Sequence, residues 1–355
     1  MGPFRSSRRF VGAVVAAALF GILPACAGPS VDSEGGPTVR VKALDVRELN
    51  SAARLHPSAT IDAGWLLDSA DARFGGFSGL LVEPDRLLLL SDRGWLWSVE
   101  RDPRAAVPFR NGSWQVRALL VEGRAPDAED LARAGDGGIL IALEGRHALA
   151  RLPGAERADT SVLELEPRPL PELFSRLPAN FGVEASASLP GDTVLVIAEH
   201  GPGGLHPAAI LGSGEPRLLV YRSEPGFAPT GAAWDGGWLY VVERKFSALS
   251  GFAVRLTATP IADPTDLPER IEPPVELARL AGSRLVDNVE AVAVEPSERG
   301  DAIRLWLVTD DNFSPLQRTV LLRLAWAPQA RARASIRRFN RTNSAGSSAS
   351  ATERK

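Results

Sequence analysis

The sequence has little sulfur, little histidine and almost no helical periodicity. One cysteine, Cys26, and four histidines occur among 355 residues. A lone cysteine excludes a disulfide framework and a cysteine-ligated zinc site. The histidines follow no zinc-ligand spacing. Instead of helical patterns, the chain has short apolar runs that end at Gly, Pro, Asp or Asn. Such runs are typical of many short antiparallel strands, so they predict an all-β fold.

Only the N-terminus carries a long apolar run. Three arginines precede an uncharged stretch over 10–23, and Leu23-Pro24-Ala25-Cys26 follows it. This pattern predicts an export signal over 1–26, of the bacterial lipoprotein type that is acylated at Cys26. We therefore expect a periplasmic or cell-envelope protein that meets the membrane only through this lipid anchor, with a linker over 27–37. A signal peptide cleaved without lipidation and an uncleaved anchor are the alternatives.

Positive charge is scarce in the part that folds. The tail over 328–355 is basic and rich in Ser and Ala, and its composition predicts disorder. Without this tail and the signal arginines, residues 27–327 hold 30 basic and 42 acidic residues, a net charge of about −12. An acidic domain lacks the positive surface that a phosphate backbone demands, so a nucleic-acid partner is excluded. We expect a monomer.

A repeat organises the region over 38–327. Five segments, which begin at residues 77, 128, 183, 230 and 289, share one pattern. A short strand of small residues leads through a turn into an apolar strand, and that strand ends at an acid. Four-stranded units of about 50 residues predict a β-propeller, here with five or six blades. The N-terminal runs "TVRVKALDVREL" and "IDAGWLLD" either form a sixth blade or add strands to the last one. A two-sheet sandwich is the alternative, but it would not explain the repeated polar ending.

The repeat also predicts where the acids lie. In each blade, the first strand lines the central channel and the second strand is buried on both faces. Antiparallel pairing brings the start of the first strand and the end of the second to the same rim. The acids expected at this rim are Asp92, Glu129, Asp130, Glu144, Glu184, Glu199, Glu243, Glu290 and Asp310.

So many carboxylates around one opening repel one another and require cations. Basic side chains that follow the acids supply one answer, namely Arg93, Arg146, His200, Arg244, Lys245 and Arg318. Calcium, which takes six to eight oxygen ligands, supplies another. Acids at strand ends can also serve only to tie neighbouring blades together. The sequence leaves these interpretations open.

Several phrases resemble one known family. "GFSGL", "LSDRG", "DAEDLA", "NFGVEA", "ERKFS", "DNVEAVAV" and "LWLVTDDNFSPLQRTVLLRL" occur in this order between about 64 and 326. In this order they resemble the bacterial phytase-like family, also called "esterase-like activity of phytase". The resemblance implies an exported propeller that hydrolyses phosphoesters or carboxylic esters, by analogy with calcium-dependent propeller phytases.

Two functional hypotheses follow. The first is a calcium-assisted hydrolase that acts on a small anionic or ester substrate at the acidic rim. Its candidate catalytic and phosphate-holding residues are Asp92, Arg93, Glu243, Arg244, Lys245 and Arg318. Its candidate metal ligands are Glu129, Asp130, Glu184, Glu290, Asp310 and Asp311. Further candidate ligand-binding residues are Asn180, His200, Asn288 and Asn312. The second hypothesis is a non-catalytic envelope propeller that binds a small ligand or a protein. A calcium lactonase that uses the asparagines is a third, weaker option.

Overall fold

The structure is a computed structural model that describes residues 36–328. Its gaps are residues 106, 110–111, 136, 153–160, 179–180, 236, 262, 264–266, 282–287 and 296–301. The predicted signal segment with Cys26 and the tail from 329 onward lie outside the described residues. Within the described ranges, no helix has the length and apolar character needed to cross a bilayer.

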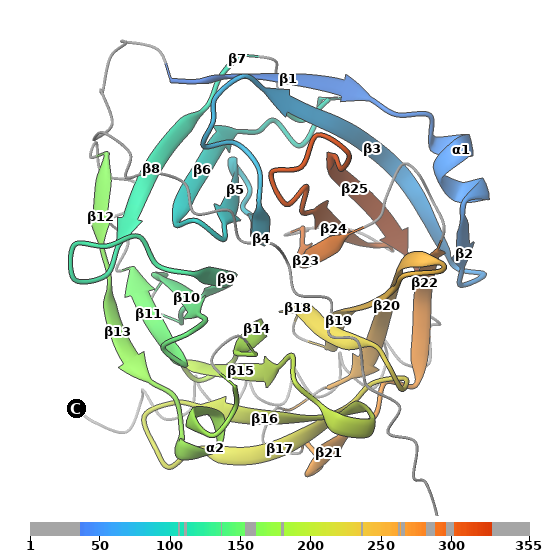
Figure 1. Cartoon of the computed structure of the whole chain (residues 1–355). Coiled ribbons are helices and arrows are strands. Elements are labelled where there is room, and N and C mark those ends of the chain that lie inside the picture. The colour runs from blue at the N-terminus through green and yellow to red at the C-terminus, as the bar shows by residue number, and fades with distance from the viewer. Residues whose placement is uncertain are drawn as a thin grey trace, which may run out of the picture. The chain divides into compact units, whose positions relative to one another are not determined.

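Five mostly antiparallel sheets surround a central channel as the blades of a propeller (Figure 1). Blade 1 contains β4 (Phe77–Val82), β5 (Arg86–Ser91), β6 (Trp95–Glu100), β8 (Gln115–Leu120) and β12 (Val162–Glu164). Blade 2 contains β9 (Ala128–Arg133), β10 (Ile139–Leu143), β11 (Ala148–Leu152) and β13 (Glu166–Pro169). Blade 3 contains β14 (Val183–Leu189), β15 (Thr193–Ala198), β16 (Leu205–Leu211), β17 (Arg217–Arg222) and β21 (Arg270–Ile271).

The other two blades take strands from both ends of the described chain. Blade 4 contains β18 (Ala228–Trp234), β19 (Trp238–Ser247), β20 (Gly251–Pro260), β22 (Val275–Ala281) and β2 (Ala53–Leu55). Blade 5 contains β23 (Val289–Val294), β24 (Ile303–Thr309), β25 (Thr319–Trp326), β3 (Ala59–Ser69), β1 (Thr38–Ala43) and β7 (Gly112–Ser113). The short helices are α1 (Val46–Ser51), α2 (Glu172–Ser175) and the 3-10 turn η2 (Pro202–Gly204).

These sheets confirm the predicted propeller and give five blades. The predicted channel-lining and second strands are observed as β4, β9, β14, β18, β23 and as β5, β10, β15, β19, β24. The N-terminal runs do not form a sixth blade. Instead β3 pairs with β25 in antiparallel register from Thr319–Leu67 to Trp326–Ala59. The ring is therefore closed by backbone hydrogen bonds between the two ends of the domain, which leaves no free edge between β3 and β25.

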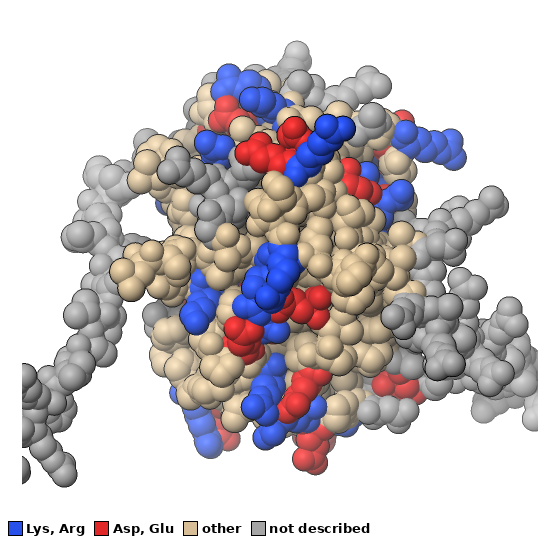
Figure 2. Space-filling model, turned by 90° about the vertical axis from the view of Figure 1, so that its right-hand side faces the viewer, with Lys and Arg blue, Asp and Glu red and all other residues tan. Residues whose placement is uncertain are grey.

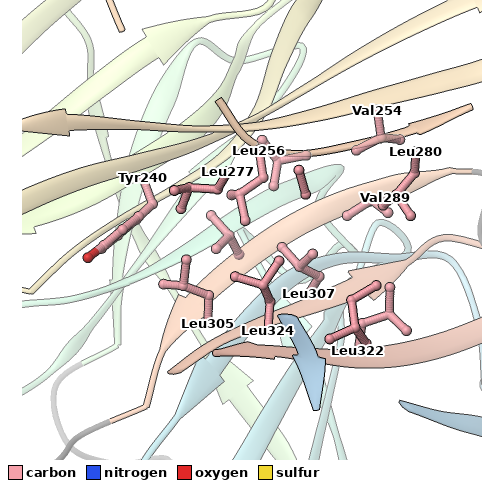
Figure 3. Packing of buried hydrophobic residues seen from close by; sticks show 14 of the residues in the cluster. Tyr240, Val254, Leu256, Leu277, Leu280, Val289, Leu305, Leu307, Leu322 and Leu324 are labelled. Atoms are coloured by element: carbon pink, nitrogen blue, oxygen red, sulfur yellow. The ribbon is translucent and has the colours of Figure 1, made fainter. Parts of the chain in front are cut away.

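The hydrophobic core lies between neighbouring blades. Figure 3 shows the layer between blades 4 and 5, where Tyr240 and Leu256 of blade 4 face Leu305, Leu307 and Leu324 of blade 5. Each fully buried leucine of this kind stabilises the fold by roughly 1.5–3 kcal/mol. On the other face of blade 5, the rings of Trp65 and Trp306 stack with centroids 5.2 Å apart. Packing of this density fixes the blades as a rigid frame around the channel.

Several charges of the outer surface are paired. Figure 2 shows the side of the propeller that carries β2 and β22, where Lys and Arg lie beside Asp and Glu. Arg54 of β2 and Arg279 of β22 both contact Glu276, at 2.6 and 2.7 Å. The carboxylates of this face therefore have guanidinium partners. The carboxylates around one end of the channel have far fewer guanidinium partners.

Candidate functional site

The same backbone irregularity recurs in all five channel-lining strands. In each strand one residue near the start has no partner in the second strand, which is a β-bulge. These unpaired residues are Ser78, Glu129, Glu184, Thr230 and Glu290. At the same level of the second strands lie Asp92, Glu144, Glu199 and Asp310, each directly after the end of its strand, and Arg244, which lies within β19. We call this end of the channel the mouth.

The acids of the mouth act on one another across the channel. Burial raises the pKa of Glu129 well above its usual value, and the charges of Asp127, Glu144 and Glu290 raise it further. Blades 2 and 5 are not neighbours, so the interaction of Glu129 with Glu290 crosses the opening. The charged set comprises eight carboxylates, from Asp92, Asp127, Glu129, Glu144, Glu184, Glu199, Glu290 and Asp310.

Blade 2 carries the tightest group of acids. Asp127, Glu129 and Glu144 each offer one carboxylate oxygen, and these three oxygens lie within 4.8 Å of one another. Burial and the charge of Asp127 raise the pKa of Glu144 to about 7. Among the described residues, no Lys or Arg forms an ion pair with these three, since the nearby Arg146 pairs with Glu122. Two ligands of one calcium ion at 2.3–2.6 Å can be up to about 5 Å apart, so the group fits a hard cation.

Blade 4 places a guanidinium where the other blades have an acid. Nη1 of Arg244 donates to Oδ1 of Asn288 at 2.9 Å and also to Glu290. Nη2 donates to Oε1 of Glu199 at 3.4 Å. Burial opposes the charge of Arg244, but the surrounding carboxylates raise its pKa. Burial raises the pKa of Glu290 to about 7, although the charge of Arg244 opposes this shift. Arg244 therefore supplies a counter-charge on the blade 3 and blade 5 side of the mouth.

The loop between β24 and β25 closes the mouth on the blade 5 side. Asp310 accepts hydrogen bonds from the backbone N–H of Asn312 at 2.6 Å and from Nδ2 of Asn288 at 3.3 Å. Burial and the charge of Glu290 raise the pKa of Asp310 to about 8. Asp311 accepts from backbone N–H groups of Gly76 and Phe313, each at 3.0 Å, and so ties this loop to blade 1.

Arg93 is an exposed cation beside the acids. It follows Asp92 directly, and its guanidinium lies 3.5 Å from the ring centroid of Phe313. Burial raises the pKa of Asp92 to about 6, while the charge of Arg93 opposes that shift. Stacking on Phe313 orients the guanidinium but leaves its N–H donors accessible to an anionic ligand.

Two predicted site residues face away from the mouth. Glu243 lies one residue before the mouth position, is fully buried, and accepts from the Tyr221 hydroxyl at 2.7 Å and from Arg255 at 2.6 Å. The register therefore places Arg244 rather than Glu243 in the ring, contrary to expectation. Asp130 is buried between blades 2 and 3, where it accepts from the N–H and the hydroxyl of Ser186. Both side chains link blades.

The remaining candidates are spread around the rim. Lys245 is exposed, and its Nζ lies 5.7 Å from the ring centroid of Phe227. His200 packs on Phe181 with ring centroids 5.1 Å apart. Arg318 is exposed, as is Asn312, which donates to Gln317. Asn180 lies outside the described residues.

Asp127 was not among the site residues predicted from the sequence. Its carbonyl accepts the backbone N–H of Glu144, just as the carbonyl of Asn288 accepts that of Asp310. Asp127 and Asn288 thus occupy the same position in blades 2 and 5, each two residues before a bulged glutamate. The repeated spacing of "DAE" and "NVE" was the signal that could have found it.

Fold and site together define a five-bladed propeller with an acidic channel mouth. The chain belongs to the phytase-like family, described as "Esterase-like activity of phytase", whose model matches residues 72–313. This match confirms the family indicated by the sequence phrases. No curated protein matches the sequence.

Solved structures with a similar chain course are distant in sequence. A luciferin-regenerating enzyme is 12% identical with a TM-score of 0.42, covering 72% of this chain and 95% of its own. A GH43 β-1,3-galactosidase is 8% identical with a TM-score of 0.45, covering 70% and 56%. Virginiamycin B lyase from Staphylococcus aureus is 9% identical with a TM-score of 0.37, covering 81% and 99%.

Proposed function

We propose that this protein is a calcium-assisted hydrolase of phosphoesters or carboxylic esters that acts at the channel mouth. The observation that carries the proposal is the group formed by Asp127, Glu129 and Glu144, with three oxygens within 4.8 Å and no ion pair to Lys or Arg among the described residues. Membership in a family described by esterase-like activity supports the same class of reaction.

The side chains of the mouth have complementary roles in this proposal. Asp127, Glu129 and Glu144 would hold calcium, which when bound neutralises substrate oxygens and favours ionisation of a coordinated water. Arg93 would hold an anionic group of the substrate, because its guanidinium is exposed and oriented by Phe313. Asp310, with a pKa of about 8, retains a proton at neutral pH and can donate it to a leaving oxygen.

Arg244 has a different role from the one expected of a substrate-binding arginine. Its donors are directed to Asn288, Glu290 and Glu199. We therefore assign it to holding these side chains in place, and we assign substrate binding to Arg93.

Hydrolysis and metal content of the purified mature protein test the proposal. Calcium is measured by elemental mass spectrometry, and turnover with p-nitrophenyl phosphate and p-nitrophenyl acetate, each with calcium or with a chelator. We expect bound calcium and a hydrolysis rate that the chelator abolishes. Asp127→Asn combined with Glu144→Gln should lower both calcium binding and turnover by at least about tenfold. Glu166→Gln, on the exposed outer strand of the same blade, is the matched control.

Two outcomes would count against catalysis. If calcium-loaded protein hydrolyses neither probe faster than the double variant, the protein is not a hydrolase of this type. Calcium binding without turnover would instead favour the non-catalytic binding propeller, which uses the same mouth.

A further inference from the structure

Blade 4 extends beyond the mouth, unlike the other blades. In blades 1, 2, 3 and 5 the second strand ends one residue before the acid of the mouth. In blade 4, β19 continues past Arg244 to Ser247, and β20 begins at Gly251. Three further residue pairs follow Arg244, namely Lys245–Ala253, Phe246–Phe252 and Ser247–Gly251. At ~3.3 Å per residue the hairpin projects about 10 Å beyond the mouth.

This hairpin carries apolar side chains on its surface. Phe246 is 62% exposed and Leu249, at the tip, is fully exposed. Phe246 and Phe252 form a cross-strand pair with ring centroids 5.0 Å apart. Phe246 lies two residues after Arg244 and therefore on the same face of β19. Tyr240 and Val242 lie on this face as well, and both belong to the core between blades 4 and 5. The face therefore points toward blade 5.

Other exposed apolar side chains gather at the same end of the propeller. The large hydrophobic residues exposed in the described chain are Val107, Val162, Leu205, Leu218, Phe246, Leu249 and Leu316. Leu205 follows the loop after β15, and Leu316, 90% exposed, lies in the loop between β24 and β25. Blades 3, 4 and 5 thus each present an exposed apolar side chain at the end of the propeller that carries the mouth. Of these, Phe246 and Leu249 share the hairpin that continues from Arg244. Apolar side chains beside a few polar groups are typical of a ligand-binding site.

We propose that the substrate of the mouth is amphiphilic, an ester or phosphoester whose alkyl, acyl or aryl arm rests on Phe246 and Leu249. This inference rests on the proposed function for the position of the head group. The argument for the occupant is continuity: Phe246 lies two residues beyond Arg244 on the same face of β19, and Arg244 contacts the acids Glu199 and Glu290, so one molecule can meet both the hairpin and the mouth.

Binding of a homologous series of non-hydrolysable ligands tests this inference. Methyl-, butyl- and octylphosphonate, below their aggregation concentrations and with calcium present, are titrated calorimetrically into the mature protein. We expect affinity to rise by at least about tenfold from methyl to octyl, since each buried methylene adds to binding. Phe246→Ser combined with Leu249→Ser should flatten the series and leave methylphosphonate binding unchanged. Leu218→Ser, an exposed position on β17, is the matched control and should keep the native slope.

The result separates this inference from the proposed function. An affinity that does not depend on chain length, or a double variant with the native slope, overturns the inference, as does absence of binding by all three ligands. The inference also fails if the phosphonate series is flat and the native protein, but not the double variant, sediments with phosphatidylcholine vesicles. That result would identify a bilayer as the occupant. Turnover of p-nitrophenyl phosphate and of p-nitrophenyl acetate is measured in parallel. Absence of both activities defeats the proposed function, while the phosphonate series still decides the inference.

Discussion

Replacement of Asp310 by Asn should lower the stability of the folded protein at acid pH and raise it at alkaline pH. In the folded protein, burial and the charge of Glu290 raise the pKa of Asp310 from 3.8 to about 8. As pH rises, Asp310 therefore loses its proton at a lower pH in the unfolded chain, where its pKa has the ordinary value, than in the folded protein. As pH rises from about 4 to about 8, the free energy of unfolding contributed by this group falls by ~1.4 kcal/mol per pH unit.

The size of the effect follows from these values. A full shift of about four units corresponds to ~6 kcal/mol, and because Glu290 also binds protons in this range we expect about 3–6 kcal/mol. Asparagine at 310 avoids this loss. It places an amide N–H₂ near Nδ2 of Asn288, where the carboxylate now accepts a hydrogen bond at 3.3 Å. That conflict costs about 1–2 kcal/mol at every pH.

The variant should therefore be less stable than the native protein at pH 4.5 and more stable by several kcal/mol at pH 8. Urea unfolding followed by tryptophan fluorescence, at constant ionic strength with chelator present, measures the difference across this range. Asp68→Asn, an exposed position on β3, is the control. A stability difference between Asp310→Asn and the native protein that stays constant from pH 4.5 to 8 would refute the reasoning.

Three further predictions separate structural from functional charges. Glu295→Gln should destabilise the fold by about 3–5 kcal/mol in urea unfolding, because it removes the carboxylate that pairs with buried Arg101 at 2.8 Å; a loss below 1 kcal/mol would contradict this. Glu243→Gln should cost only about 1–3 kcal/mol, since Arg255 keeps Glu276 at 2.9 Å, and calorimetry should find calcium binding unchanged. Arg93→Gln should lower kcat/KM about tenfold for p-nitrophenyl phosphate but little for uncharged p-nitrophenyl acetate; an equal loss for both would exclude a phosphate contact.

The blades could be predicted because their signal is local and repeated. The apolar runs that became β5, β10, β15, β19 and β24 are continuous, as burial on both faces requires. The turns between first and second strands contain Gly, Asp or Pro. The position of the acids at one rim then followed from antiparallel pairing alone. The sequence left open whether the N-terminal strands form a sixth blade or join the last one. The reason is that β3 and β25 are far apart in the chain, so no local pattern shows that they pair.

The direction of individual side chains could not be predicted, because it depends on the bulges. Side chains alternate along a regular strand, and one unpaired residue changes which member of a pair faces the channel. Glu129 and Asp130 are adjacent, yet Glu129 is the bulged residue at the mouth and Asp130 binds Ser186 between blades. The sequence showed both acids but not the bulge.

Arg244 breaks the near-fivefold symmetry of charge at one level of the mouth. The residues at this level of the second strand are Asp92, Glu144, Glu199, Arg244 and Asp310 in blades 1 to 5. An acid in place of Arg244 would distribute negative charge evenly around the mouth. A cation would then have no preferred blade. With Arg244 there, the blade 3 and blade 5 sides have an internal counter-charge, whereas Asp127, Glu129 and Glu144 have none among the described residues. A mobile cation therefore gains most beside blade 2. A repeated fold thus produces a one-sided site where its repeat places a guanidinium instead of an acid.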